Sequence, residues 1–178
     1  MLENKDRLRE CLRNVIDLAK LFEYDESVII SLLNEVDGLE DVVFLKAVRN
    51  DYAKVVEILL KYERVDPTAE DNYAIRYAAA NGHAEIVEML LKDKRVDPAA
   101  DDNYAIRNAA ANGYVRVVEL LLKDKRVNPG ADDNYAVRNA AANGHTEIVE
   151  MLLKDKRVNL TVAERIWLKI LAKNIGKK

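Results

Sequence analysis

The chain has 178 residues, of which 49% are hydrophobic and 33% are charged, a composition typical of a folded protein and too apolar for a disordered one. Its net charge of −3 provides no general attraction to nucleic acid or anionic membranes, and Cys11, the only cysteine, excludes an internal disulfide. The N-terminus is charged at once, and no apolar run approaches the ~20 residues of a membrane span. We therefore expect a mature chain without a secretory signal that works in the cytoplasm.

Residues 1–39 are predicted to form an N-terminal helical cap. A first amphipathic helix is followed by a second that begins near Asp25 and ends at Val36, and Gly38 suits the left-handed conformation that ends a helix. An open-ended array needs such a cover for its terminal apolar surface, although a separate binding element is the alternative. The apolar stripe of the first helix consists of Leu8, Leu12, Val15, Ile16 and Ala19.

Residues 40–160 repeat with a fixed period. Asn81, Asn112 and Asn143 each precede a glycine, and they are spaced by 31 residues. A period of about 20–50 residues predicts a solenoid, in which each unit buries its apolar face only against its neighbours. We therefore expect four helix–turn–helix repeats, the first of them diverged. The three close copies span residues 70–95, 101–126 and 132–157.

The first close copy illustrates the expected unit. Asp71 or Asn72 can cap a short helix from Tyr73 to Ala80, and the Asn81-Gly82 pair can end it. A second helix is expected from about Ala84 to Asp93, because its apolar residues recur at spacings of three and four. Small alanines on the short helix should allow neighbouring helices to approach closely.

Both ends of the repeated region depart from this pattern. In the diverged first copy, Asp51 stands where the later copies have glycine. After the last copy, Thr161 and Glu164 form a T-x-x-E capping box, which predicts a helix start. Asn174 keeps the 31-residue register, so residues 161–178 are expected to form a half-repeat, a single capping helix that closes the far end.

The repeated core is AAANGHAEIVEMLL at residues 78–91, with counterparts at 109–122 and 140–153. It resembles the ankyrin repeat pattern A-A-x-x-G-H-x-E-[IV]-V-x-x-L-L, which implies an all-α, ankyrin-type solenoid of stacked helix–turn–helix repeats. The unit is shorter than the usual ~33 residues, so we expect compact loops with little or no hairpin character. The family's T-P-L-H helix start is replaced by Y-A-[IV]-R in each close copy, so a preceding Asp or Asn must supply the cap.

The residues that could carry chemistry favour structural roles. His83 and His145 occupy equivalent positions two repeats apart, and the resemblance implies that such a histidine bonds the backbone at the turn. Carboxylates recur once per unit, as solvated faces do, whereas a catalytic pair should be a singular constellation. Cys11 has no histidine nearby and is interpreted as a core thiol. We therefore expect no enzyme activity, no cofactor and no metal.

Partner binding is the function that the resemblance implies, because ankyrin repeat proteins usually engage other proteins through a concave face of short helices and adjoining loops. Tyr77, Tyr114 and Arg116 are the strongest candidate anchors, because they break the repeat pattern and belong to residue types enriched at interfaces. We expect a monomer that binds another protein, with neither nucleic acid nor membrane as partner. The other candidates on this face are Asn72, Arg76, Asn103, Arg107, Asn108, Asn134, Arg138 and Asn139.

The uniformity of those positions favours a second hypothesis. A surface selected for one irregular partner should differ from repeat to repeat, because specificity depends on non-uniform anchors. Nearly identical positions are instead typical of a near-consensus scaffold, natural or engineered, that has no selected target. The sequence leaves both hypotheses open.

Overall fold

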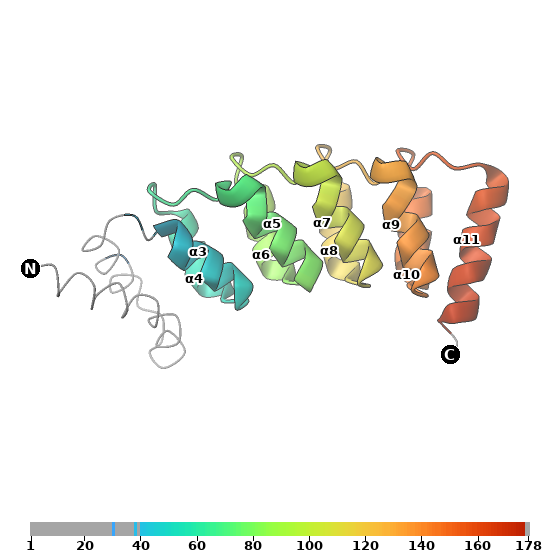
Figure 1. Ribbon diagram of the computed structural model, residues 1–178, viewed down its shortest axis with the longest axis horizontal. Coiled ribbons are helices and arrows are strands. Elements are labelled where there is room, and N and C mark those ends of the chain that lie inside the picture. The colour runs from blue at the N-terminus through green and yellow to red at the C-terminus, as the bar shows by residue number, and fades with distance from the viewer. Residues whose placement is uncertain (1–29, 31–37, 39, 177–178) are drawn as a thin grey trace, which may run out of the picture. The chain divides into compact units, whose positions relative to one another are not determined.

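The computed structural model describes residues 30, 38 and 40–176, and within that part of the chain the regular structure is entirely helical. Its residues fall into two compact units, 1–69 and 70–178, which we describe separately (Figure 1). The predicted N-terminal cap lies outside the described residues, apart from Ile30 and Gly38. Gly38 has a φ of 80°, the left-handed conformation expected for it.

The described part of the first unit is one helix pair, α3 (Glu40–Arg49) and α4 (Ala53–Leu60). Phe44 and Leu59 are fully buried where the two helices pack together. The turn between them contains Asp51 with a φ of 57°, at the position where the later repeats have glycines with φ between 79° and 82°. The diverged first repeat therefore keeps the turn conformation of the others without the residue that adopts it most readily.

The second unit is a stack of helix pairs that ends in a single helix. In Figure 1 the first helices of the pairs form a front layer and the second helices lie behind them. The last helix packs against both members of the final pair. This arrangement confirms the predicted all-α solenoid. The helices are α5 (Ala69–Asn81), α6 (Ala84–Lys92), α7 (Ala100–Ala111), α8 (Val115–Lys123), α9 (Ala131–Ala142), α10 (Thr146–Lys154) and α11 (Val162–Ile175).

The core of this stack repeats with the sequence. In α7, Ala105 and Ala109 are fully buried beside Ile106, and the small side chains permit close approach of the neighbouring helices. The second helix of the pair contributes larger side chains, among them Val118 and Leu121, which are also fully buried. Burying one such aliphatic side chain stabilises the fold by about 1.5–3 kcal/mol. The larger residues therefore supply most of the stability, and the alanines allow the close packing that buries them.

The start of each first helix differs from the expected N-cap. Asp101, Asp102 and Asn103 all have left-handed φ values between 52° and 61°, and regular helix begins after them. No side-chain cap bond forms at this end of α7. Instead, Asn103 Oδ1 accepts a 2.6 Å hydrogen bond from the amide of Asn128 in the next loop. The capping prediction was therefore wrong, because the asparagine joins two repeats rather than closing its own helix.

The same left-handed turn opens the other two first helices of the second unit. Asn72 Oδ1 accepts from the Asp97 amide at 2.7 Å, whereas the Asn134 amide group donates to the Asn159 carbonyl at 3.1 Å. Asp and Asn tolerate left-handed backbone better than most residues, which accounts for their presence at every turn position except that of Glu70. The turn residues are Glu70–Asn72 in α5, Asp101–Asn103 in α7 and Asp132–Asn134 in α9.

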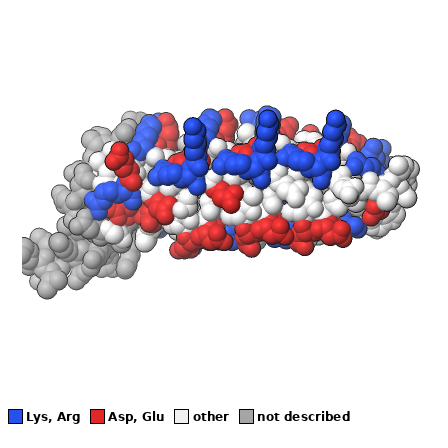
Figure 2. All heavy atoms as spheres, turned by 90° about the horizontal axis from the view of Figure 1, so that it is seen from above, with Lys and Arg blue, Asp and Glu red and all other residues white. Residues whose placement is uncertain are grey.

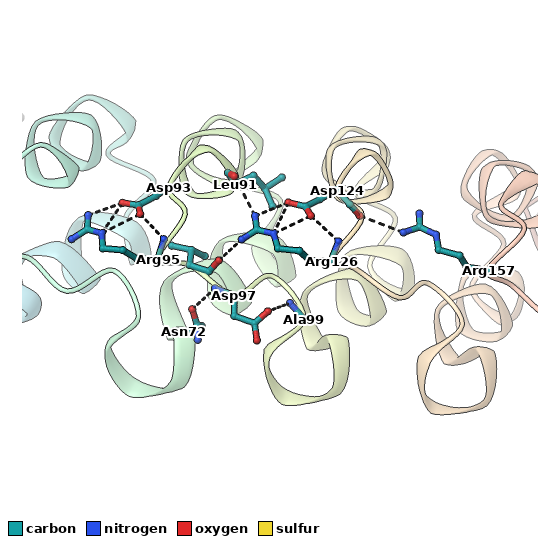
Figure 3. A network of polar contacts seen from close by, with 10 residues as sticks. Asn72, Leu91, Asp93, Arg95, Asp97, Ala99, Asp124, Arg126 and Arg157 are labelled. Atoms are coloured by element: carbon teal, nitrogen blue, oxygen red, sulfur yellow. Dashed lines mark hydrogen bonds and ion pairs between the residues drawn. The ribbon is translucent and has the colours of Figure 1, made fainter.

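The loops between repeats are compact turns, as expected, and in the loops after α8 and α10 an arginine binds the repeat before it (Figure 3). Arg126 donates from Nη1 to the Val96 carbonyl at 2.6 Å and from Nη2 to the Leu91 carbonyl at 3.3 Å. One repeat later, Arg157 donates to the carbonyls of Val127 and Leu122 at 2.6 and 2.9 Å. We call this recurring contact the arginine clamp.

An aspartate two residues earlier holds each clamp in place. Asp124 accepts hydrogen bonds from Nε and Nη2 of Arg126 and from the Arg126 backbone amide, at 2.6 to 3.2 Å. The side-chain hydrogen bonds from Arg126 lower the pKa of Asp124 below its ordinary value of 3.8, although partial burial opposes the shift. Because an aspartate fixes the guanidinium from one side, its remaining donors point to the carbonyls of the neighbouring repeat.

The last helix begins at the predicted capping box. The Glu164 amide donates to Thr161 Oγ1 at 3.3 Å, and Glu164 Oε2 accepts from the Thr161 amide at 2.9 Å. Arg165 then donates to the carbonyls of Leu153, Val158 and Leu160, so it fastens α11 to the repeat before it in the manner of a clamp.

Replacing Leu121 by alanine should lower the free energy of unfolding by about 2–5 kcal/mol, because the side chain is fully buried in α8 and its loss leaves a cavity. Denaturant unfolding measures the change. Lys123→Ala, at an exposed position of the same helix, is the control and should change stability by no more than about 0.5 kcal/mol. Equal losses for both variants would contradict the interior position of Leu121.

Replacing Asp124 by asparagine should cost about 1–3 kcal/mol at neutral pH, because the arginine clamp loses its charged acceptor. A carboxyl whose pKa is lower in the folded state contributes stability above its unfolded pKa and loses it as the pH falls through the folded value. The difference between parent and variant should therefore shrink below about pH 4, as urea unfolding at several pH values would reveal. Asp102→Asn, at an exposed position, controls for the loss of one negative charge.

Candidate functional site

The first helices of the second unit present one half-exposed side to solvent, which we call the first-helix face. In α5, Ala74, Ile75, Ala78 and Ala79 are buried, and the intervening residues form the outward stripe. The same helical spacing recurs in α7 and α9. The face is formed by Tyr73, Arg76, Tyr77 and Ala80, then Tyr104, Arg107, Asn108 and Ala111, then Tyr135, Arg138, Asn139 and Ala142.

A ladder of arginine and tyrosine runs across this face. The guanidinium carbon of Arg76 lies 5.6 Å from the ring centroid of Tyr104 in the next repeat, and that of Arg107 lies 5.3 Å from Tyr135. A guanidinium within about 6 Å of a ring centroid is attracted by the π-electrons of the ring. Each tyrosine is therefore held by the arginine of the preceding repeat.

These arginines have further partners inside the array. Arg107 pairs with Asp132 at 2.5 Å and donates to the Asp101 carbonyl at 3.2 Å, and Arg76 makes the equivalent ion pair with Asp101. Arg138 lies within 3.4 Å of Glu164 in α11. Three of the four arginines predicted as partner contacts, Arg76, Arg107 and Arg138, thus lie on the first-helix face, but they donate hydrogen bonds to the left-handed turns and to the next element of the array.

The asparagines predicted as partner contacts divide into two groups. Asn103 and Asn134 are only 8% and 7% exposed, and Asn72, like them, bonds the following repeat. Asn108 and Asn139 remain half-exposed on the face, where each side-chain amide donates to a carbonyl one helical turn earlier, that of Tyr104 or Tyr135. Asn103 and Asn134 therefore offer almost no surface to a partner, whereas Asn72, Asn108 and Asn139 remain half-exposed.

Tyr77 lies on the first-helix face as predicted. Its ring stacks on Tyr73 with centroids 5.4 Å apart and lies 6.1 Å from the His83 ring. Tyr73 and Tyr77 together form a half-exposed aromatic surface. Tyr77 stands at the position that asparagine occupies in the next two repeats. This is the point at which the face departs most from uniformity.

Tyr114 and Arg116 do not extend the first-helix face. The Tyr114 ring covers Gly82 of the preceding repeat so closely that a Cβ on the glycine would lie 2.6 Å from it. His145 covers Gly113 in the same way, and its Nε2 lies 3.1 Å from the Ala111 carbonyl, which agrees with the backbone role inferred for it. Arg116 belongs to α8 in the second layer, where it pairs with Glu119 at 3.2 Å and lies 3.8 Å from Glu88.

A row of exposed carboxylates borders the face, and these residues were interpreted from the sequence only as helix caps or solvated charges. Figure 2 shows acidic side chains gathered along one edge of the repeats, with lysine and arginine projecting elsewhere on the same view. The available signal was the acidic pair before each N-Y-A motif, which places two carboxylates at the start of every first helix. We call this row the acidic border; it consists of Glu70, Asp71, Asp101, Asp102, Asp132 and Asp133.

Other kinds of site find no support in the described part of the chain. Residues 30, 38 and 40–176 contain no group of three or more His, Cys, Asp or Glu placed to hold a metal ion. No described helix combines the length and the apolar character needed to cross a membrane.

Comparison with known proteins identifies the repeats. A family model described as "Ankyrin repeats (3 copies)" matches residues 15–102 and again residues 75–164. No curated protein gives a significant match to the chain.

The contacts of the arginine–tyrosine ladder predict that replacing Arg107 by lysine lowers the stability of the fold. Arg107→Lys keeps the charge but removes the planar fork that reaches Asp132, the Asp101 carbonyl and the Tyr135 ring, so unfolding should become easier by about 1–3 kcal/mol. Arg116→Lys is the matched control, because exposed ion pairs contribute only about 0–1 kcal/mol. A loss of equal size in both variants on chemical denaturation would show that the ladder adds nothing.

Proposed function

The chain belongs to the ankyrin repeat family, and we propose that it is a non-catalytic protein-interaction module whose partner binds the first-helix face. Ankyrin repeats generally mediate protein–protein interaction, and the proteins that contain them are typically not enzymes. Within the expected concave-face site we favour the half-exposed tyrosines and asparagines, because the arginines and the turn asparagines bond within the array.

The observation that supports this function best is a row of ordered, half-exposed tyrosines. Tyr73, Tyr104 and Tyr135 stand at the same point of three successive first helices, and arginines of the preceding repeat hold the latter two. Tyrosine provides a large amphipathic contact area with few rotatable bonds, so a ring that is already fixed loses little entropy on binding. Such a row is a preorganised surface for another protein.

The acidic border indicates the charge of the partner. Asp71, Asp102 and Asp133 are exposed at equivalent positions beside the tyrosine row. Carboxylates at the rim of an interface attract cationic residues and raise the association rate, an effect that salt screens. We therefore expect a partner segment that carries lysine or arginine and binds more slowly at high ionic strength.

The near-consensus scaffold without a selected target keeps one observation in its favour. Asn108 and Asn139, with Arg107 and Arg138, repeat without change in two successive units. A face shaped by one irregular partner should vary at such positions. Tyr77, which breaks this uniformity, supports the interaction module instead.

Charge reversal separates the two functions. The triple variant Asp71→Lys, Asp102→Lys and Asp133→Lys should reduce capture of a specific protein from cells of the source organism at least about tenfold, because the rim then repels a cationic partner. The control is Glu85→Lys, Glu147→Lys and Glu150→Lys, which reverses the same number of exposed carboxylates on second helices. The captured protein is identified by mass spectrometry.

A photo-crosslinking residue then locates the contact. Placed at position 77, 108 or 139, it should join the captured protein, whereas at position 85, 116 or 147 on the second helices it should not. Capture of no protein by the parent chain favours the scaffold. Equal loss of capture in both triple variants would mean that net charge, rather than this face, governs binding.

A further inference from the structure

The last helix is apolar on the side that faces solvent. Its inward residues Leu168 and Ala172 are buried against the final helix pair. On its other side, Ile166 is 55% exposed, Trp167 57% and Ile170 55%. Among the described residues, the large apolar side chains with marked exposure lie on α11 with the sole exception of Val42. Clustered exposed apolar residues rimmed by charge mark interaction sites, whereas scattered ones need no explanation.

The 31-residue register shows which surface these residues form. Ile166 and Ile170 stand where α9 has Tyr135 and Asn139, so they continue the first-helix face to the end of the array. Trp167 stands where α9 has Ala136, which is fully buried. The exposed residues of α11 therefore occupy the corner between the first-helix face and the end of the stack.

The 31-residue register also excludes a further repeat of this array as the occupant of the corner. Between repeats, the position of Ala136 is occupied by alanine in every first helix of the second unit, because only a small side chain lets the next repeat approach closely. An indole at this position holds a further repeat of the same geometry away from α11. The apolar corner therefore requires an occupant of another kind.

The positive charge beside the exposed apolar residues of α11 excludes a second copy of this chain as the occupant. Lys169 and Lys173 are exposed on α11, and the sequence continues with Lys177 and Lys178. The only carboxylate on the helix, Glu164, caps the helix start and lies within 3.4 Å of Arg138. Two copies of the chain paired through α11 would bring these lysines together, and like charges across an interface oppose association.

We propose that the outward side of α11 is a docking surface for an acidic amphipathic helix of a partner protein. Val162, Ile166 and Ile170 are spaced by four residues and form the ridge that a second helix can pack against. Trp167 supplies the large anchor, and Lys169 and Lys173 meet carboxylates beside the partner's apolar stripe. This surface continues the first-helix face beyond the tyrosine row, but its lysines select a partner of the opposite charge to the one that the acidic border attracts.

Trp167 is the only tryptophan in the chain, so its fluorescence reports directly on the proposed surface. The probe is a synthetic helical peptide with leucines at spacings of three and four and glutamates on either side of them. The control peptide keeps the leucines and replaces every glutamate with lysine. The acidic peptide should shift the emission of the full chain to shorter wavelength and protect it from iodide quenching, and the lysine peptide should bind at least about tenfold more weakly.

Two matched variants test the role of the lysines. Lys169→Glu with Lys173→Glu should reverse the preference, so that the lysine peptide binds more tightly than the acidic one. Lys123→Glu with Lys154→Glu makes the same charge change at exposed positions on α8 and α10 and should leave the preference unaltered. All four positions are exposed, so circular dichroism should show folded protein in each case.

Other occupants of the surface give different and decisive results. Shielding of Trp167 from iodide in the dilute chain without peptide would mean that the chain itself covers the corner, and shielding that grows with protein concentration would mean that a second copy does. A shift produced by phosphatidylserine-containing vesicles but not by the acidic peptide would assign the surface to lipid. Each of these results overturns the proposal, and none of them bears on binding at the tyrosine row and the acidic border.

Discussion

The stack of the second unit depends on the arginine clamp, which Arg126 and Arg157 each make with the repeat before them. A solenoid has no single core, so every repeat must be fixed to its neighbour by contacts that recur with the period. Apolar packing is poorly directional and would tolerate some sliding of one helix pair on the next. The guanidinium of Arg126 or Arg157, oriented by an aspartate two residues earlier, bonds carbonyls 30 and 35 residues back and so defines the register. Charged donors bound to otherwise unpaired carbonyls make strong hydrogen bonds, which suits them to this role.

The same need for cohesion decides which polar residues remain available to a partner. Arg76, Arg107 and the turn asparagines belong to positions that in a generic array would face the ligand, yet here they bond the following repeat or the left-handed turn. The half-exposed side chains that remain are the tyrosines, Asn108 and Asn139, with exposed carboxylates beside them. The surface available for recognition is therefore smaller than the solvent-facing stripe, and it is more rigid.

Much of the fold could be predicted from the sequence because each copy of the repeat gives the same prediction independently. The period, the helix pairs, the compact loops and the Thr161–Glu164 capping box follow from local rules that each copy states again. The left-handed Asp-Asp-Asn turn could not be predicted, since the same residue types are also good N-caps and only the bond from Asn103 to the next loop decides between them.

The candidate site was harder to predict for the same reason. Arg116 and Tyr114 differ from the residues at the equivalent positions of the other repeats, but such a difference does not show on which face a residue lies. Arg116 lies in the second layer, and Tyr114 covers Gly82. Conversely, the sequence shows that Trp167 replaces an alanine of the repeat, but only the structure shows that its side chain is exposed, because the described contacts of α11 are with α9 and α10 on its other side.

Among the described residues, the hydrogen bonds that join consecutive repeats span 25 to 35 residues, so none of them reaches beyond the adjoining repeat. Copying one whole unit within the gene would therefore give a longer protein in which every such bond finds its usual donor and acceptor. Losing a fraction of a unit would leave several of them without a counterpart at once. Because these bonds join only adjacent repeats, gene duplication can lengthen the array by whole repeats. The helix α11, with Trp167, would stay unchanged after the last repeat.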